Sequence, residues 1–279
     1  MQEKVVSLPT GEAHYWQNST KKGAPTIIMI HGFRGTHHGL LKITAKLGDN
    51  YNLIIPDLPG FGASQPFKSS KNNLESYIDF LKNFIKFFDF KTPPNLLAHS
   101  FGTIIASAYV AQNPNAVDKL ILLSPIAELP MPKPVTYTLL PIVKLLHALP
   151  EKPGAKLTGN KLVADVMSLY TTKTKDPELK KWIKAEHRRY FNTFVTNKAM
   201  TEAMRTSMLN YVAQFAQKIP NQTLIIHGDK DNVGKTKKQQ NLYKFFPRAQ
   251  SKMIRGTGHL TPYEKPAEAA WAIENFIQS

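Results

Sequence analysis

The sequence of 279 residues contains no cysteine. This excludes a disulfide scaffold, a thiolate nucleophile and every metal centre that needs a thiolate ligand. No apolar run reaches the roughly 18 to 20 residues that a membrane-spanning helix needs, and Met1 to Lys4 lead into a segment interrupted by polar residues rather than into a signal-peptide apolar region. The sequence therefore predicts a cytoplasmic protein with no transmembrane segment.

Acidic residues are few, with 20 Asp and Glu against 36 Lys and Arg, for a formal charge of +16. Such an excess of positive charge favours association with nucleic acid or with an anionic membrane. No stretch holds five consecutive basic residues, however, and the richest windows are 180–184 and 235–238. A solvated basic surface is favoured, so we expect no nucleic-acid partner and leave only a weak association with an anionic surface open. The oligomeric state cannot be read from these features.

Short apolar runs alternate with helical patterns along most of the chain, which predicts an α/β fold with a mostly parallel sheet covered on both faces. The first two runs flank a turn at Pro9 to Gly11 and predict a hairpin. The runs expected to form strands are 4–8, 13–16, 26–30, 52–55, 95–98, 119–123, 222–226 and 252–254.

Between Glu128 and about Gln217 the alternation stops and prolines become frequent, which predicts a helical module inserted into the sheet domain. We expect core segments 1–127 and 218–279 and a helical cap at 128–217. The cap helices are expected near 138–148, 161–170, 177–195 and 198–218. Its apolar residues fit either packing onto the sheet, which is favoured, or the lining of an acyl pocket; they are Met131, Leu139, Leu140, Ile142, Val143, Leu145, Leu146, Val166, Met167, Leu169 and Tyr170.

Ser100 lies where a buried apolar strand runs directly into an apolar helix, with Ala98 and Gly102 two residues to either side. Small residues at both places allow the strand and helix backbones to approach closely, as a nucleophile elbow requires. An ordinary helix cap at Ser100 would not need small neighbours on both sides. We therefore predict that Ser100 is a nucleophile.

With this elbow the chain resembles the α/β-hydrolase superfamily, in particular its lidded serine-hydrolase branch of esterases, lactonases, perhydrolases and carbon–carbon bond hydrolases. The resemblance spans nearly the whole chain and implies an eight-stranded, mostly parallel sheet flanked by helices, with an inserted helical lid. The matching motifs lie in family order at 31–35, 56–64, 96–106, 227–231 and 256–260.

A serine hydroxyl needs a base, and an imidazole acts best as that base when a carboxylate orients it. The family order of Ser, acid and His implies His259 as the base, in the Gly256-Thr257-Gly258-His259 segment. Spacing alone leaves the acid open between Asp229 and Asp231. The family pattern G-x-x-D, counted from Gly228, implies Asp231 and leaves Asp229 to brace the loop, with Glu128 a remote third choice. Gly234 stands where relatives often carry proline.

Two backbone N–H groups must stabilise the oxyanion of the tetrahedral intermediate. The resemblance implies those of Phe33 and Phe101. His31, His37 and His38 are clustered in sequence, yet adjacent side chains diverge and no carboxylate stands at ligand spacing. No metal or other cofactor is therefore expected.

These residues predict a serine hydrolase that cleaves a carboxylic ester, or a related acyl bond of a small molecule, through an acyl-enzyme. A carbon–carbon bond hydrolase or a lactonase of the same fold is the alternative, although the segment Phe33 to Thr36 lacks the glycine-rich loop typical of carbon–carbon hydrolases. A ligand-binding protein without turnover is the further alternative, because a fold does not by itself fix a function.

Overall fold

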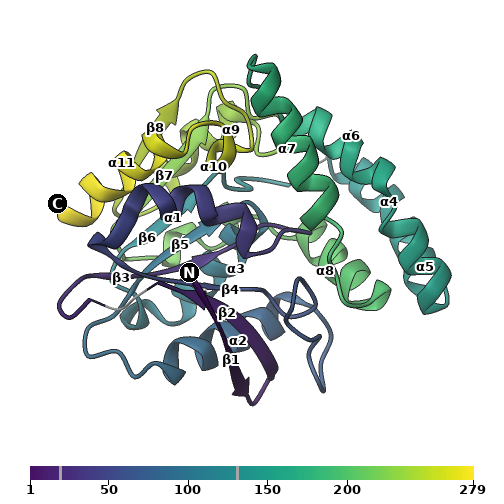
Figure 1. The fold of residues 1–279 in the computed structure, drawn as a ribbon, viewed down its shortest axis with the longest axis horizontal. Helices are drawn as coiled ribbons and strands as arrows, with labels where there is room; N and C mark the ends of the chain where they lie inside the picture. Colours follow the sequence, from purple (N-terminus) through teal and green to yellow (C-terminus); the bar gives the residue numbers. More distant parts are fainter. Residues whose placement is uncertain (19–20, 130–131) are drawn as a thin grey trace.

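The computed structural model describes residues 1–18, 21–129 and 132–279. Its centre is an eight-stranded sheet in the order β1-β2-β4-β3-β5-β6-β7-β8 (Figure 1). Strands β3 to β8 are parallel, and β2 pairs antiparallel with β1 on one side and with β4 on the other. The strands are β1 Gln2–Leu8, β2 Gly11–Gln17, β3 Thr26–Ile30, β4 Asn52–Pro56, β5 Asn95–His99, β6 Leu120–Leu123, β7 Thr223–Gly228 and β8 Ala249–Ile254. The sequence prediction of this α/β sheet is confirmed.

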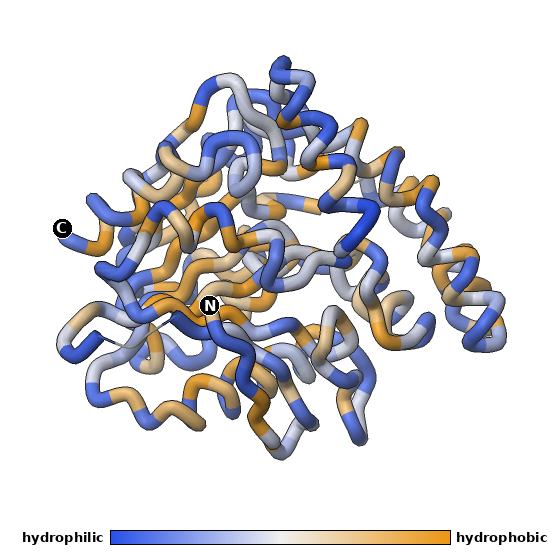
Figure 2. Tube along the Cα trace, viewed as in Figure 1, coloured by the Kyte–Doolittle hydropathy of each residue, from blue (hydrophilic) through white to orange (hydrophobic). Residues whose placement is uncertain are grey.

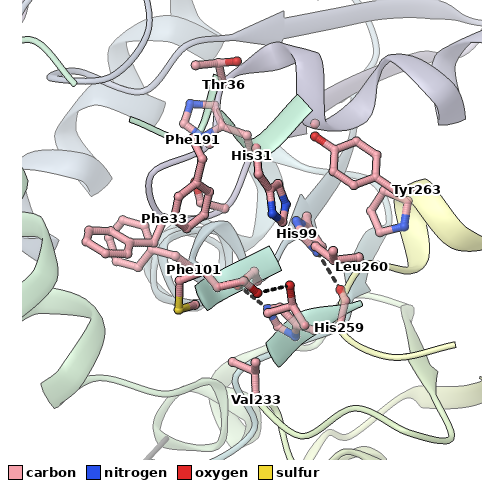
Figure 3. A pocket seen from close by; sticks show the side chains of 18 of the residues that line it. His31, Phe33, Thr36, His99, Phe101, Phe191, Val233, His259, Leu260 and Tyr263 are labelled. Atoms are coloured by element: carbon pink, nitrogen blue, oxygen red, sulfur yellow. Dashed lines mark hydrogen bonds between the residues drawn. The ribbon is translucent and has the colours of Figure 1, made fainter. Parts of the chain in front are cut away.

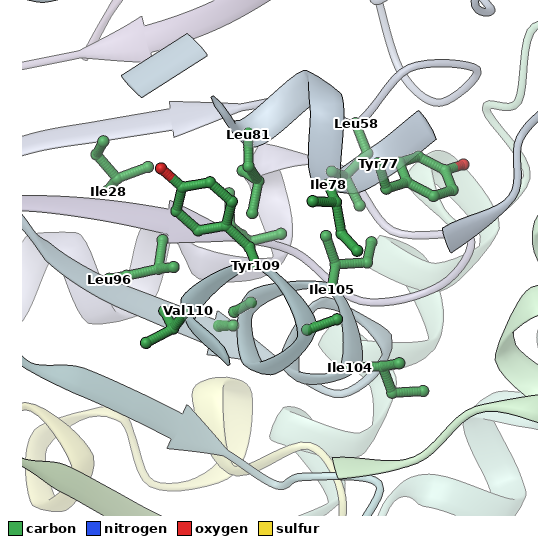
Figure 4. Packing of buried hydrophobic residues seen from close by; sticks show 14 of the residues in the cluster. Ile28, Leu58, Tyr77, Ile78, Leu81, Leu96, Ile104, Ile105, Tyr109 and Val110 are labelled. Atoms are coloured by element: carbon green, nitrogen blue, oxygen red, sulfur yellow. The ribbon is translucent and has the colours of Figure 1, made fainter. Parts of the chain in front are cut away.

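Helices cover both faces of the sheet. Their bounds are α1 Leu41–Leu47, α2 Leu74–Phe87, α3 Phe101–Gln112, α9 Thr236–Leu242, α10 Thr261–Glu264 and α11 Pro266–Gln278. On one face α2 and α3 pack on the strands, where Leu81 and Ile105 meet Ile28 and Leu96 (Figure 4). On the other face α1 and α11 bury Ile43 and Ile273 against Ile27. Two buried faces explain why the central strands read as uninterrupted apolar runs.

A second group of helices follows β6 and precedes β7. It comprises α4 Lys133–Ala148, α5 Glu151–Thr158, α6 Lys161–Thr171, α7 Pro177–Tyr190 and α8 Asn197–Leu209. In Figure 1, α4, α5 and α6 lie at the end of the molecule away from the C-terminus. We refer to α4 to α8 as the inserted helices.

The inserted helices differ from the sequence prediction in four places. Helix α4 begins five residues earlier than expected, and α5, which contains Pro153, lies in a proline-containing stretch where no helix was expected. Proline is tolerated in the first turn of a helix, where its missing N–H has no intrahelical partner. Helix α7 ends at Tyr190, and α8 ends at Leu209 before two 3-10 turns.

The expected packing of the apolar residues in this segment is wrong for half of the described ones. Val143 is buried, and Leu139, Leu140, Leu146 and Met167 are half-buried. The exposed ones are Ile142, Leu145, Val166, Leu169 and Tyr170. Met131 lies outside the described residues. The pattern identified residues that share a helix face but not the direction in which that face points.

Candidate active site

Ser100 lies in a sharp turn between β5 and α3. Its backbone adopts φ 53° and ψ −119°, a left-handed conformation that is unfavourable for a residue with a side chain. The turn is fixed by the Ser100 N–H, which donates to the Leu123 carbonyl at 3.1 Å. A Cβ atom on Gly102 would lie 2.7 Å from the His31 carbonyl oxygen, so only glycine allows α3 to approach β3 this closely. Ala98 is accommodated within β5 and is fully buried.

His259 connects the turn to the far end of the sheet. Its Nε2 lies 2.7 Å from Ser100 Oγ (Figure 3), and its Nδ1 lies 2.9 Å from Asp231 Oδ2. His259 is 5% exposed and Asp231 is 3% exposed. The structure thus brings together three residues from loops that follow β5, β7 and β8, in a hydrogen-bonded chain from carboxylate to imidazole to hydroxyl.

The Asp231 carboxylate is held by further donors on both oxygens. The N–H groups of Val233 and Gly234 each donate to Oδ1 at 2.9 Å, and Gln239 Nε2 donates to Oδ2 at 2.8 Å. Burial alone would raise the pKa of Asp231, but the charge and hydrogen bond of His259, together with the bonds from Gln239 and Gly234, lower it to about 2. Asp231 is therefore an anion at neutral pH.

The other two candidate acids point elsewhere. Asp229 Oδ1 accepts the Gly256 N–H at 2.7 Å, which ties the loop after β7 to the loop after β8. Glu128 forms an exposed ion pair with Lys238 at 3.0 Å. Neither side chain contacts His259 in the part of the chain that the structure describes.

The side chain of Gln239 explains why position 234, where the family resemblance leads us to expect proline, is occupied by glycine. A Cβ atom at position 234 would lie 2.0 Å from Gln239 Nε2 and 2.5 Å from the Pro125 carbonyl oxygen. Gln239 also donates to that carbonyl at 2.9 Å. The absence of a side chain at Gly234 therefore makes room for the amide that holds Asp231.

Phe33 and Phe101 lie next to each other beside the Ser100 turn. Their rings meet edge to face with centroids 6.0 Å apart, and both line the cavity (Figure 3). The Phe101 amide is the first N–H of α3, and such a group has no partner within its helix. A Cβ atom on Gly32 would lie 3.0 Å from Ser100 Cβ, so the segment containing Phe33 rests against the serine.

Arg34 is buried, at 5% exposure, although it has no carboxylate within ion-pair distance among the described residues. Its guanidinium donates to the Thr158 carbonyl at 2.6 Å and to Asn192 Oδ1. It also lies over the ring of Phe191, 5.2 Å from the centroid. Burial lowers the pKa of Arg34 to about 10, so the group stays protonated at neutral pH and joins the segment beside Ser100 to the inserted helices.

Two residues that sequence reasoning missed, half-buried His99 and buried Glu264, support the His259 loop. His99 Nε2 donates to the His259 carbonyl at 3.1 Å, and burial followed by the charge of His259 lowers the pKa of His99 to about 3. Glu264 Oε2 accepts the Gly258 N–H at 2.8 Å and the Thr257 hydroxyl at 2.6 Å, while its Oε1 accepts the N–H groups of residues 173 and 174. Glu264 stands beside Lys265 in a short polar segment, so no local signal distinguished it from an exposed acidic residue.

A cavity of about 270 Å³ opens at Ser100 and is lined by the sheet domain and the inserted helices. Apolar side chains dominate its wall, including Phe33, Phe101, Met208 and Val233. In Figure 3, Val233 lies on one side of His259, and Thr36 and Tyr263 lie on the other. This arrangement suits a small apolar molecule with a polar centre.

The rings of His37 and His38 do not diverge as expected, because their centroids lie 3.9 Å apart, but each of the clustered histidines also has a structural partner. His31 Nε2 accepts the Leu58 N–H at 2.8 Å, His37 Nδ1 lies 3.0 Å from Asp57 Oδ1, and the His38 ring stacks on Tyr190. Within the described ranges, no group of three or more His, Asp or Glu side chains is arranged to hold a metal ion. Nor does any helix of those ranges have the length and apolar character needed to cross a membrane.

Comparisons with known proteins agree with the fold. The model of the α/β-hydrolase fold family matches residues 25–266. Lipase 1 of Psychrobacter immobilis is 29% identical over 96% of this chain and 81% of its own length, and Lipase 3 of Moraxella sp. (strain TA144) is 26% identical over 97% and 82%. A thermophilic esterase from Thermogutta terrifontis has the same fold, with a TM-score of 0.80, 19% identity and coverage of 100% of this chain and 98% of that one.

Proposed function

Because the chain belongs to the α/β-hydrolase fold family, we propose that it hydrolyses carboxylic esters with Ser100 as the nucleophile. The observation that carries this proposal is the 2.7 Å contact between Ser100 Oγ and His259 Nε2 at a strained strand-to-helix turn. Two relatives aligned over most of their length are lipases, which supports an ester as the bond that is cleaved.

In the proposed reaction, His259 removes the Ser100 proton as Oγ attacks the ester carbonyl. The Asp231 anion orients the imidazole through Nδ1 and stabilises the imidazolium that forms. The negative charge moves to the former carbonyl oxygen. The backbone N–H groups of Phe33 and Phe101 are proposed to donate to this oxygen, because Phe101 directly follows the serine and the segment containing Phe33 rests against it.

The tetrahedral intermediate then collapses, and the alcohol leaves with the proton held by His259. The acyl group remains on Ser100 Oγ. A water molecule, deprotonated by His259, attacks this acyl-enzyme, and collapse of the second intermediate releases the carboxylic acid and returns the proton to Ser100. The apolar wall of the cavity limits the water that competes for these hydrogen bonds.

We further propose that residues 128–217 form a cap over a core made of 1–127 and 218–279. Cavity-lining residues come from both parts, with Met167 and Phe191 from the proposed cap and Phe33 and Leu260 from the core. The buried contacts of Arg34 with Thr158 and Asn192 hold the two parts together beside Ser100. In this arrangement the cap determines which acyl and alcohol groups fit.

A fluorophosphonate probe combined with turnover of p-nitrophenyl butyrate tests the proposal. The wild-type protein should be labelled at Ser100 and should release nitrophenol, whereas Ser100→Ala should do neither. Ser107→Ala is the matched control, because Ser107 lies on α3, is fully buried and does not line the cavity. EDTA should leave turnover unchanged. A folded wild-type protein that shows neither labelling nor turnover would instead be a ligand-binding protein.

A further inference from the structure

Helix α6 exposes its apolar side to solvent. Leu162, Val166, Leu169 and Tyr170 are 68%, 64%, 83% and 49% exposed. Their spacing of four, seven and eight residues from Leu162 places all four on one face of the helix. In a helix that only packs against its own protein, this stripe would face inward.

The side of α6 that does face inward carries small and polar residues instead. Ala164, Ser168 and Thr171 are buried. Their spacing of four and seven residues places them together on the opposite side of the helix from Val166. The orientation of α6 is therefore the reverse of a normal amphipathic surface helix, and its apolar stripe contributes little to the packing of the chain.

Helix α4 repeats this orientation at the same end of the molecule. It exposes Val135, Ile142 and Leu145 at 44%, 52% and 66%, and it buries Val143. Figure 2 shows apolar residues along this end of the chain, outside the apolar centre formed by the sheet. We refer to the exposed residues Val135, Ile142, Leu145, Leu162, Val166, Leu169 and Tyr170 as the apolar face.

Lysine side chains accompany the apolar face. Helices α4, α5 and α6 carry exposed lysines that form no ion pair within the described residues, namely Lys133, Lys144, Lys152, Lys156 and Lys161. The acidic residues on these helices are Glu151 and Asp165. Asp165 is already paired with Arg188 at 2.6 Å, and Glu151 accepts the Asn197 N–H. Exposed apolar residues flanked by unpaired lysines are typical of helices that lie in the plane of a lipid–water interface.

From this combination we propose that α4 and α6 dock the protein on an anionic lipid surface. Charge selects this occupant over a second copy of the chain, because two chains of net charge +16 repel each other whereas anionic headgroups attract the lysines. Met167 and Thr171 of α6 also line the cavity at Ser100, so a docked lipid would lie next to the cavity wall. The docking itself does not depend on catalysis; its role in delivering ester lipids rests on the function proposed above.

Vesicle co-sedimentation tests the docking. The wild-type protein should bind vesicles of phosphatidylglycerol and phosphatidylcholine more strongly than vesicles of phosphatidylcholine alone, and added salt should weaken the binding. The triple variant Leu162→Gln, Val166→Gln, Leu169→Gln should have a partition coefficient into anionic vesicles about tenfold lower than that of the wild type. Its lysines remain, but its apolar stripe is gone. Glutamine keeps helix propensity high, so α6 should stay folded.

Trp271→Gln is the matched control, because Trp271 is an equally exposed apolar residue (59%) on α11, away from the inserted helices (Figure 1). It should bind vesicles like the wild type. Equal losses in both variants, or no binding by the wild-type protein, would refute the proposal. A concentration-dependent dimer in sedimentation velocity that the triple variant abolishes would also overturn it and identify a second copy as the occupant.

Turnover of a water-soluble short-chain ester separates docking from catalysis. The triple variant should hydrolyse it at the wild-type rate, because none of the three leucine and valine residues lines the cavity. Ser100→Ala should bind anionic vesicles like the wild type. A protein that binds vesicles but hydrolyses no ester would retain the docking proposal and lose the proposed function.

Discussion

Asp231 and His259 are joined by a 2.9 Å contact between Oδ2 and Nδ1, although 28 residues separate them in the sequence. Asp229, two residues before Asp231, is turned away and accepts the Gly256 N–H instead. The two carboxylates of this loop therefore have different partners. One is available to orient the imidazole, and the other joins two loops.

This difference predicts unequal effects of removing the two charges. Asp231→Asn should lower kcat by about 10⁴-fold, because an amide at this place no longer stabilises the imidazolium or fixes its tautomer. Asp229→Asn keeps an oxygen that can accept the Gly256 N–H and should retain most of the activity. Steady-state kinetics on p-nitrophenyl butyrate measure both. Similar losses in the two variants would show that the acid is wrongly assigned.

The pH dependence of kcat/KM should show a single ionisation. The pKa of Asp231 near 2 and that of His99 near 3 place both groups outside the range from pH 4.5 to 9. The base must be a neutral imidazole, so kcat/KM for a neutral ester should rise with pH through one ionisation and then level off. A flat profile over this range would exclude a histidine base.

Much of the fold could be predicted because its strands and turns depend on residues that are close together in the sequence. Uninterrupted apolar runs indicated the parallel strands, and small residues around Ser100 indicated the turn, since both depend on neighbours within a few positions. The placement of Ser100, Asp231 and His259 in successive loops followed from a family resemblance rather than from the local pattern.

What the sequence could not predict depends on distant contacts. The acceptor role of Glu264 requires residues 173 and 174 of the inserted segment to pass beside it, about 90 positions earlier in the chain. The amphipathic stripes of α4 and α6 were visible, but periodicity alone does not reveal whether a stripe faces the core or solvent. A stripe that faces a partner outside the chain, as proposed for these helices, has the same sequence period as a stripe that packs on the core.

Glu264 gives a test of these long-range contacts. Glu264→Gln replaces one acceptor oxygen with an NH₂ group that must face N–H or O–H donors, so we expect a loss of about 1 to 3 kcal/mol in the free energy of unfolding. It should also lower kcat/KM, because Gly258 precedes His259. Glu268→Gln, which removes a 53% exposed partner of Lys265, should change neither quantity measurably. Urea unfolding measures the free energy of unfolding of both variants, and ester kinetics measure their kcat/KM. Equal values for the two variants would contradict the prediction.

Buried His187 predicts how stability depends on pH. It is 5% exposed, and burial lowers its pKa to about 4. In the unfolded chain a histidine titrates near pH 6.5, so between pH 6.5 and 4 the unfolded state binds a proton that the folded state does not. The stability due to neutral His187 is therefore complete above pH 6.5 and decreases as the pH falls, by about 2 kcal/mol at pH 5.

Urea unfolding of the wild-type protein and of His187→Gln at pH 7.5 and pH 5 measures this contribution. Glutamine does not titrate, so the variant should lose less stability than the wild type between the two pH values, whatever its stability at pH 7.5. Burial also lowers the pKa of His31, His38, His99 and His227, so these four histidines should contribute to the pH dependence that remains. An identical loss in both proteins would mean that His187 takes up its proton without unfolding, and that its ring reaches solvent in the folded state.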